Sequence, residues 1–242
     1  MTADRAGEPG DEGGLRVVAL PGGTWGVDEV RRVRRLCTDV ASDDAVRAVV
    51  FTGASQAVWA EPSTRDLVEG AASLAWLGLV AAPVICALEG PIGGAGREFS
   101  LACDLRIADA STVFVFGGSD EFPVAGGGQR LARLVGRARA LELMLWGGTL
   151  DAGAALQWGL ISRIVPAGSA REAAIAVART IVSRGPIGVR YTKEAILRGG
   201  EVSLDQALQL ETDLATLLQA TTDRAEGVRA FIEKRRPEFK GE

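Results

Sequence analysis

The segment that most restricts the fold is an uncharged apolar run that passes through a glycine-rich turn into an apolar helix. Residues 84–88, reading VICAL, have the composition of a buried strand. Gly93, Gly94 and Gly96 follow, and glycines let the backbone turn tightly and approach other groups closely. Residues 99–103, reading FSLAC, are then predicted to continue as a helix. A buried strand, a tight turn and a helix in succession favour an α/β fold.

Glu98 is the acidic residue at the start of this predicted helix. The first N–H groups of a helix have no partner inside the helix, and the helix dipole makes this end attractive to negative charge. A carboxylate beside such donors is what an acid–base group next to an anion-stabilising site would require. We therefore take Glu98 as the candidate catalytic residue. The alternative is an early-turn acid that only stabilises the helix.

Strand and helix patterns alternate along much of the chain. Runs rich in β-branched residues predict strands at 15–20, 46–52, 105–108, 113–116 and 160–165. Apolar residues at near-helical spacing predict a helix at 27–41. Such alternation implies parallel strands joined by crossover helices. After about residue 128 the pattern is mainly helical, with helices predicted at 131–145, 152–158, 170–183, 186–198, 203–219 and 223–235.

These patterns divide the chain into three parts. Residues 1–14 are acidic and glycine-rich, without the apolar core of a signal peptide, and are predicted to be a disordered tail. Residues 15–165 are predicted to form an α/β core and residues 166–242 a helical C-terminal region. The uncharged stretch 71–88 is long enough for a membrane span. Gly78 and Pro83 interrupt it, so a helix followed by a core strand is preferred.

The composition excludes several classes of site. The chain has no histidine, which removes the usual serine and cysteine triads and histidine metal ligands, and no metal site is expected. The net charge of −4 provides no footprint for nucleic acid, so neither nucleic acid nor a membrane is an expected partner. Cys37, Cys86 and Cys103 lie in apolar surroundings and are expected to be free thiols, which fits a cytoplasmic protein.

Several motifs, taken in their order along the chain, resemble those of the crotonase superfamily, the enoyl-CoA hydratases and isomerases. Each motif is weak alone, and the ordered series carries the resemblance. The motifs are VVFTG at 49–53, PVICA at 83–87, GPIGGAG at 90–96, CDLRIA at 103–108, GGGQRL at 126–131, AGAALQWGLI at 152–161 and FIEKRRPEFKG at 231–241. The glycine spacings match neither a dinucleotide-binding loop nor a P-loop.

The resemblance implies a crotonase-like spiral of ββα and βαβ units over residues 15–165. The helical region that follows would mediate trimerisation and lie on the adenine side of coenzyme A. Members of the superfamily act on acyl thioesters, so the expected partner is an acyl-CoA or a carrier-protein thioester. Coenzyme A would enter as part of the substrate, and no further cofactor is expected. The expected assembly is a homotrimer or homohexamer.

The resemblance also assigns roles to individual residues. In the family, two backbone N–H groups hold the thioester oxygen and stabilise an enolate-like transition state. Ala60 and Ala95 occupy these positions here, with Gly94 beside the second as a substrate-binding residue. Glu98 falls on the first of two catalytic glutamates. Phe231 and Lys234 fall where the family packs against the adenine of the coenzyme, and a phosphate contact is expected from residue Arg65.

The sequence departs from the family pattern at the second catalytic glutamate. That glutamate normally follows a proline soon after the strand at 113–116, and here the place reads Phe116-Gly117-Gly118. Asp120 and Glu121 are candidate replacements, although neither is in register. Hydration is most easily catalysed by two carboxylates that share the water, whereas one carboxylate can still move a proton between carbons.

Two further departures concern the pocket. The loop after Ala60 reads Glu61-Pro62, and Pro62 stiffens it, since proline lacks an N–H and restrains the residue before it. The segment 66–83, which commonly roofs the acyl pocket, is short. We therefore expect an open pocket that accepts a bulky or carrier-borne acyl group.

Together these features predict an acyl-thioester enzyme, a lyase or isomerase, that stabilises an enolate in an oxyanion hole. The main hypothesis is an enoyl-CoA hydratase, dehydratase or isomerase with Glu98 as its single catalytic glutamate. One alternative is thioester decarboxylation or other enolate chemistry in specialised metabolism. The other is a catalytically inactive crotonase-like subunit or thioester-binding partner.

Overall fold

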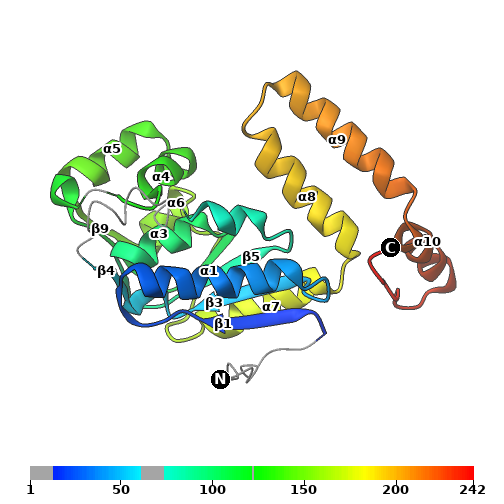
Figure 1. Ribbon diagram of the computed structural model, residues 1–242, viewed down its shortest axis with the longest axis horizontal. Helices are drawn as coiled ribbons and strands as arrows, with labels where there is room; N and C mark the ends of the chain where they lie inside the picture. The colour runs from blue at the N-terminus through cyan, green and yellow to red at the C-terminus, as the bar shows by residue number, and fades with distance from the viewer. Residues whose placement is uncertain (1–12, 61–73, 122) are drawn as a thin grey trace.

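The computed structural model describes residues 13–60, 74–121 and 123–242, and it has the α/β fold expected from the sequence. Its centre is a five-stranded sheet in the order β1-β3-β5-β7-β10 (Figure 1). The strands are β1 (Leu15–Ala19), β3 (Ala48–Thr52), β5 (Val84–Leu88), β7 (Leu105–Asp109) and β10 (Arg163–Val165). All neighbours in this sheet pair in parallel, which confirms the predicted crossover connections.

Short strands form two smaller sheets beside the central one. β2 (Gly23–Trp25) pairs with β4 (Ala57–Trp59) in parallel. β8 (Val113–Phe116) pairs in parallel with β6 (Pro91–Ile92) and antiparallel with β9 (Gly148–Asp151). Each of the first four central strands is followed by one of these short strands, so the chain spirals through repeated ββα units. Strands of two to four residues carry too few side chains to show a period of two, which is why the sequence did not predict β2, β4, β6 and β9.

Helices connect and cover these sheets. They are α1 (Val27–Ser42), α3 (Gly94–Ala102), α4 (Gly127–Val135), α5 (Arg137–Trp146), α6 (Ala152–Gln157), α7 (Ala170–Val182), α8 (Pro186–Gly199), α9 (Leu204–Gln219) and α10 (Thr222–Glu233), with 3₁₀ turns η1 (Ala54–Gln56), η2 (Ala75–Leu79) and η3 (Gly118–Asp120). The prediction of one helix over 131–145 was wrong. Gly136 has a φ of 85°, a left-handed conformation that ends α4 and starts α5.

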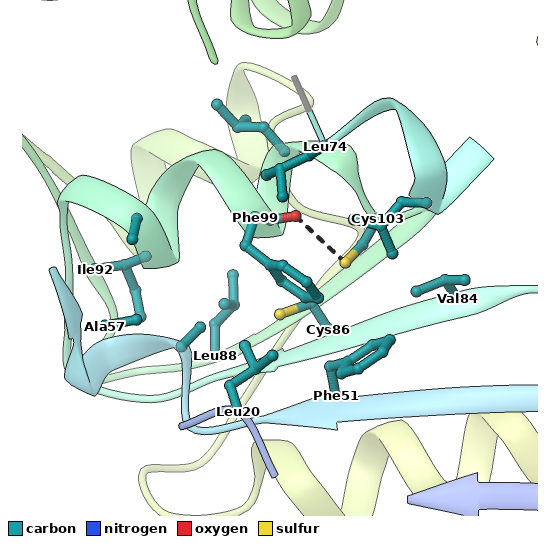
Figure 2. Packing of buried hydrophobic residues seen from close by; sticks show 14 of the residues in the cluster. Leu20, Phe51, Ala57, Leu74, Val84, Cys86, Leu88, Ile92, Phe99 and Cys103 are labelled. Carbon is teal, nitrogen blue, oxygen red and sulfur yellow. Dashed lines mark hydrogen bonds between the residues drawn. The ribbon is translucent and has the colours of Figure 1, made fainter. Parts of the chain in front are cut away.

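Both faces of the central sheet are buried, because successive side chains on a strand point to opposite faces. Val50 and Ile85 face α7, which approaches closely through three buried alanines, Ala170, Ala174 and Ala178. Phe51 and Cys86 point to the other face, towards α3 (Figure 2). There the ring of Phe99 packs edge-on against Phe51, with 5.0 Å between ring centroids. This contact fixes α3 above the sheet.

The last three helices project from the body of the molecule (Figure 1). Lys193 of α8 holds them to the core, since its Nζ lies 2.6 Å from Asp104 Oδ2 and donates to the carbonyl oxygens of Val80 and Ala82. An apolar groove of about 770 Å³ lies between α8 and α10 at the edge of the core, with Leu105, Ile196, Val228 and Phe231 among its lining residues. Among the described helices, none has the length and apolar character needed to cross a bilayer. The division at residue 165 stays a prediction.

Candidate active site

Glycines set the position of α3. A Cβ added to Gly96 would lie 1.8 Å from the carbonyl oxygen of Ala54, so only glycine lets α3 rest on the backbone of η1. Gly94 has a φ of 44°, and a Cβ there would lie 3.3 Å from the backbone nitrogen of Trp59. The N-terminal end of α3 therefore adjoins β4 closely. This is the close backbone approach that the glycine-rich turn predicted.

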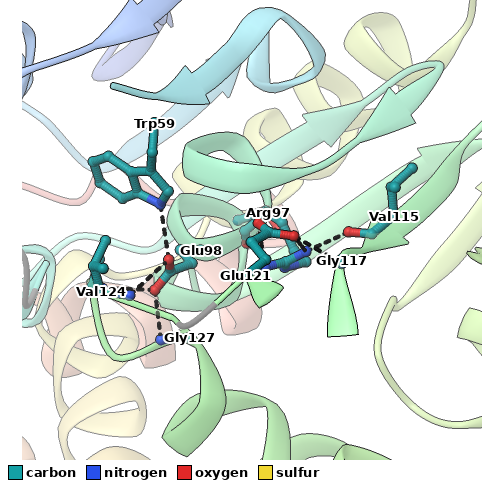
Figure 3. A network of polar contacts seen from close by, with 10 residues as sticks. Trp59, Arg97, Glu98, Val115, Gly117, Glu121, Val124 and Gly127 are labelled. Carbon is teal, nitrogen blue, oxygen red and sulfur yellow. Dashed lines mark hydrogen bonds and ion pairs between the residues drawn. The ribbon is translucent and has the colours of Figure 1, made fainter. Parts of the chain in front are cut away.

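Glu98 lies in this junction with only 1% of its surface exposed. Its Oε1 accepts hydrogen bonds from Trp59 Nε1 at 2.8 Å and from the N–H of Val124 at 3.2 Å. Its Oε2 accepts from the N–H groups of Ala125 at 2.8 Å and Gly127 at 2.9 Å (Figure 3). A carboxylate has about four acceptor positions, so these four donors from the described chain satisfy it.

Arg130 of α4 supports the loop that holds Glu98. Its Nη1 donates to the carbonyl oxygen of Ala125 at 2.6 Å, the residue whose N–H binds Glu98 Oε2. Burial lowers the pKa of Arg130, and the charge of Glu98 acts in the opposite direction. The two side chains are therefore close enough to interact electrostatically.

Of the two backbone amides expected to bind a thioester oxygen, one has a hydrogen-bond acceptor in the described structure and the other does not. Ala95 is fully buried in the first turn of α3, where N–H groups lack partners within the helix, and no described residue accepts a hydrogen bond from its N–H. The N–H of Ala60 donates to the carbonyl oxygen of Trp25 at 2.9 Å and so extends the β2–β4 ladder. A thioester oxygen would have to replace that carbonyl to reach Ala60.

Glu121, one of the two candidates for a second carboxylate, is held by Arg97. The Arg97 guanidinium contacts Glu121 through Nη2 at 2.9 Å and Nη1 at 3.3 Å, and Glu121 also accepts from the N–H of Gly117. Arg97 donates to the carbonyl oxygen of Val115 as well. In Figure 3 this network and that of Glu98 are separate. The side chain of the other candidate, Asp120, lies outside the described part of the structure.

The residues expected at the coenzyme lie on and after α10. The side chain of Phe231 is exposed, with 85% of its surface accessible, and Lys234 follows α10 in a left-handed conformation with a φ of 54°. The tail after Lys234 folds back, because Arg235 pairs with Glu226 through both carboxylate oxygens. Arg65 lies outside the described residues. Across the described chain, no group of three or more cysteine or acidic side chains is arranged to hold a metal ion.

Sequence reasoning missed two residues that contact the candidate acids. Trp59 binds Glu98, and the available signal was a tryptophan directly before Ala60. Arg97 binds Glu121, and the signal was a second charged residue beside Glu98 in a buried helix. Neither partner is close in sequence, so the contacts themselves could not be predicted.

Comparison with known proteins agrees with this geometry. The sequence profile of the enoyl-CoA hydratase/isomerase family matches residues 36–242. The chain is 35% identical to a Mycobacterium tuberculosis protein named "Probable enoyl-CoA hydratase echA8", over 87% of this chain and 86% of that one. It is 36% identical to the 2,3-dehydroadipyl-CoA hydratase of Escherichia coli, over 83% of this chain and 84% of the relative.

A solved structure is also similar. The crystal structure of an enoyl-CoA hydratase from Bacillus anthracis superposes with a TM-score of 0.85 at 33% identity, covering 95% of this chain and 96% of the other. The profile match spans most of the sequence, and the structural match spans nearly all of it. Both agree with the ordered motifs and the ββα spiral. The chain belongs to the enoyl-CoA hydratase/isomerase family of the crotonase superfamily.

Proposed function

We propose that this enzyme moves a proton between two carbons of an unsaturated acyl thioester, with Glu98 as its single catalytic carboxylate. The observation that carries the proposal is the hydrogen bonding of the two acids. Glu98, within α3, is held by N–H donors, whereas Glu121 is paired with Arg97. Among the described residues, every group hydrogen-bonded to Glu98 is an N–H donor, so no second acid shares its position.

The proposed reaction is a double-bond isomerisation. Glu98 takes a proton from the carbon next to the thioester carbonyl of a 3-enoyl thioester, and the C–H electron pair moves into the conjugated system. Negative charge then develops on the carbonyl oxygen, where the N–H of Ala95 and the dipole of α3 stabilise it. Glu98 returns the same proton to the fourth carbon. The product is a 2-enoyl thioester of unchanged composition.

Hydration is the second candidate, because the similar proteins from Mycobacterium tuberculosis and Escherichia coli are named hydratases. Water addition needs a group that activates the water and one that protonates the carbon. With Glu98 alone, one carboxylate would first have to activate the water and then protonate the carbon. Isomerisation places a smaller demand on the site, since one carboxylate removes and returns one proton.

The substrate class and assembly follow the same proposal. We propose an acyl-CoA or carrier-protein thioester whose carrier end lies near Phe231 and Lys234. We also propose a homotrimer or homohexamer in a reducing compartment such as the cytoplasm. Support for assembly comes from large apolar residues exposed on the projecting helices, namely Ile196, Leu204, Leu208, Leu217, Phe231 and Ile232. The three cysteines are free and buried. Sedimentation analysis distinguishes a monomer from a trimer or hexamer.

The decisive test is product analysis of purified protein with 3-enoyl-CoA and 2-enoyl-CoA substrates of several chain lengths. Liquid chromatography coupled to mass spectrometry resolves the 2-enoyl isomer from the 3-enoyl isomer, which have the same mass, and detects hydration by the added mass of one water. We expect isomerisation, and Glu98→Gln should lower its rate by roughly 10²-fold or more. Glu142→Gln, on the exposed side of α5, is the matched control and should retain activity. Exclusive hydration, or full activity in Glu98→Gln, would contradict the proposal.

A further inference from the structure

The four donors to Glu98 differ in how they are held. Three are backbone N–H groups of Val124, Ala125 and Gly127, which one loop fixes together. The fourth is the indole N–H of Trp59, a side chain that can change rotamer. Among the described donors, Trp59 is thus the one that can leave Glu98 without movement of the backbone.

The four hydrogen bonds that the Glu98 carboxylate accepts limit its ability to act as a base. Because a carboxylate has about four acceptor positions and described donors fill that number, Glu98 can take a proton from a carbon only after one donor leaves. The donor that leaves should be the movable one, and it binds Oε1. An indole N–H is a donor only, so Trp59 neither removes a proton from the substrate nor accepts one from Glu98.

Trp59 also lies directly before Ala60, at the end of β4. The N–H of Ala60 donates to the carbonyl oxygen of Trp25, and the Trp59 ring packs edge-on against the Trp25 ring, with 6.1 Å between centroids. If a thioester oxygen accepted the hydrogen bond from the Ala60 N–H, the bond from Ala60 to the carbonyl oxygen of Trp25 would break at the end of β4. The movement that frees the Ala60 amide therefore acts directly on the residue that holds Glu98 Oε1.

We propose that Trp59 is a positioning residue that controls Glu98. Its indole N–H holds Oε1 in the observed orientation and leaves it when the thioester oxygen draws Ala60 away from Trp25. Oxyanion binding and release of the base are thereby coupled at the end of β4. The inference rests on the proposed function, since it concerns how Glu98 becomes able to accept a proton.

The proposal predicts a change in pH dependence when the indole N–H is removed. A hydrogen bond to the charged form of an acid favours that form, so its loss lets the group take up a proton at higher pH. Of the described elements packed against α3, α4 carries two charged side chains, Arg130, which acts on Glu98, and the exposed Arg133. β7 adds the buried Arg106, whose Nη1 donates to the carbonyl oxygen of Ser100 on α3 at 3.1 Å. On α3 itself, Arg97 is paired with Glu121.

The test compares Trp59→Phe with Trp158→Phe. Both remove an indole N–H and keep an aromatic ring, but the Trp158 ring lies under Arg139, and its N–H is not among the described donors to Glu98. The acid limb of the kcat/KM profile, measured with a 3-enoyl-CoA, should move to higher pH by about one unit in Trp59→Phe and stay in place in Trp158→Phe. Trp59→Gln restores a side-chain N–H donor and should return the limb towards its original position.

An acid limb that is identical in the two phenylalanine variants overturns the proposal, and so does a shift that Trp59→Gln fails to reverse. If Trp59→Phe does not fold, the unaltered protein provides the answer through its ¹⁵N-indole resonances. The Trp59 N–H signal should titrate with the midpoint of the acid limb, and a signal that does not titrate overturns the proposal. Full activity in Glu98→Gln would instead overturn the proposed function, so the two failures are distinguishable.

Discussion

Gly127 donates its backbone N–H to Glu98 Oε2 at 2.9 Å, and the two residues leave no room for a side chain between them. A Cβ added to Gly127 would lie 2.6 Å from Glu98 Cγ and 2.8 Å from Oε2. Gly127→Ala must therefore displace the carboxylate from its donors. Since a misplacement of about 1 Å in a catalytic group can cost roughly 10²-fold, we expect kcat/KM to fall by about that factor.

The matched control for Gly127→Ala is Gly78→Ala in η2. A Cβ added there meets no atom within 4 Å, and its φ is not in the left-handed region. Enzyme kinetics on both variants, with circular dichroism to verify folding, checks the prediction. Equal activity in the two would show that Glu98 need not keep its observed position.

Gly96→Ala should destabilise the fold, and the same substitution in another helix should not. The new Cβ of residue 96 would overlap the Ala54 carbonyl oxygen, whereas at Gly188 of α8 the nearest atom is Leu218 Cδ2 at 3.8 Å. We expect Gly96→Ala to lower the free energy of unfolding by about 1–3 kcal/mol or more through overpacking. Gly188→Ala should raise it by up to about 1 kcal/mol through helix propensity.

Urea denaturation followed by tryptophan fluorescence measures both free energies of unfolding. The predicted effects have opposite signs, so the comparison does not depend on the absolute accuracy of either extrapolation. A Gly96→Ala protein as stable as Gly188→Ala would mean that α3 can shift away from η1 without cost.

The segment 235–238, which follows α10, should loosen from Glu226 in acid. Hydrogen bonds from Arg235 and from the N–H of Glu238 lower the pKa of Glu226 from 4.5 to about 2. A carboxyl group whose pKa is lower in the folded state stabilises that state above its unfolded pKa. That contribution should therefore be lost as the pH falls from 4.5 towards 2.

The chemical shift of the Glu238 amide reports this transition, because that N–H donates to Glu226 Oε1 at 3.0 Å. In Glu226→Gln the pH dependence between 4.5 and 2 should disappear. Glu233→Gln, which removes the other acidic partner of Arg235, should retain it. Circular dichroism over the same range separates local detachment from acid unfolding of the whole chain.

Loss of Lys193 should loosen the projecting helices before it affects the core. Its ammonium group bonds to Asp104 and to two backbone carbonyls, so Lys193→Met leaves three acceptors without this donor. We expect faster limited proteolysis in the segment between α7 and α8. Arg190→Met on the same helix removes a partly exposed ion pair with Asp44 at 4.0 Å and a hydrogen bond to the Asp44 carbonyl oxygen at 3.4 Å, and it should change the cleavage rate little. Equal cleavage rates would show that the Lys193 contacts do not hold α8.

The chain order of the main elements could be predicted from the sequence because their patterns are local. β3 and β5 are almost entirely apolar, since both faces of a parallel sheet are buried, and β1 and β7 are apolar apart from Arg16, Arg106 and Asp109. α1 shows helical spacing of buried and exposed residues. The short strands β2, β4, β6 and β9 were missed because they form by pairing with strands that are distant in the sequence. The break at Gly136 was missed although the glycine itself marks it locally.

For the site, the sequence alone determined that Glu98 and Ala95 share the first turns of one helix, because residues three apart on a helix are neighbours whatever the rest of the chain does. Only the tertiary structure decided what these groups contact. Trp59 reaches Glu98 across 39 positions, and Arg97 reaches Glu121 across 24. Such contacts depend on how the ββα spiral brings distant strands and loops together, which is a property of packing and not of any local pattern.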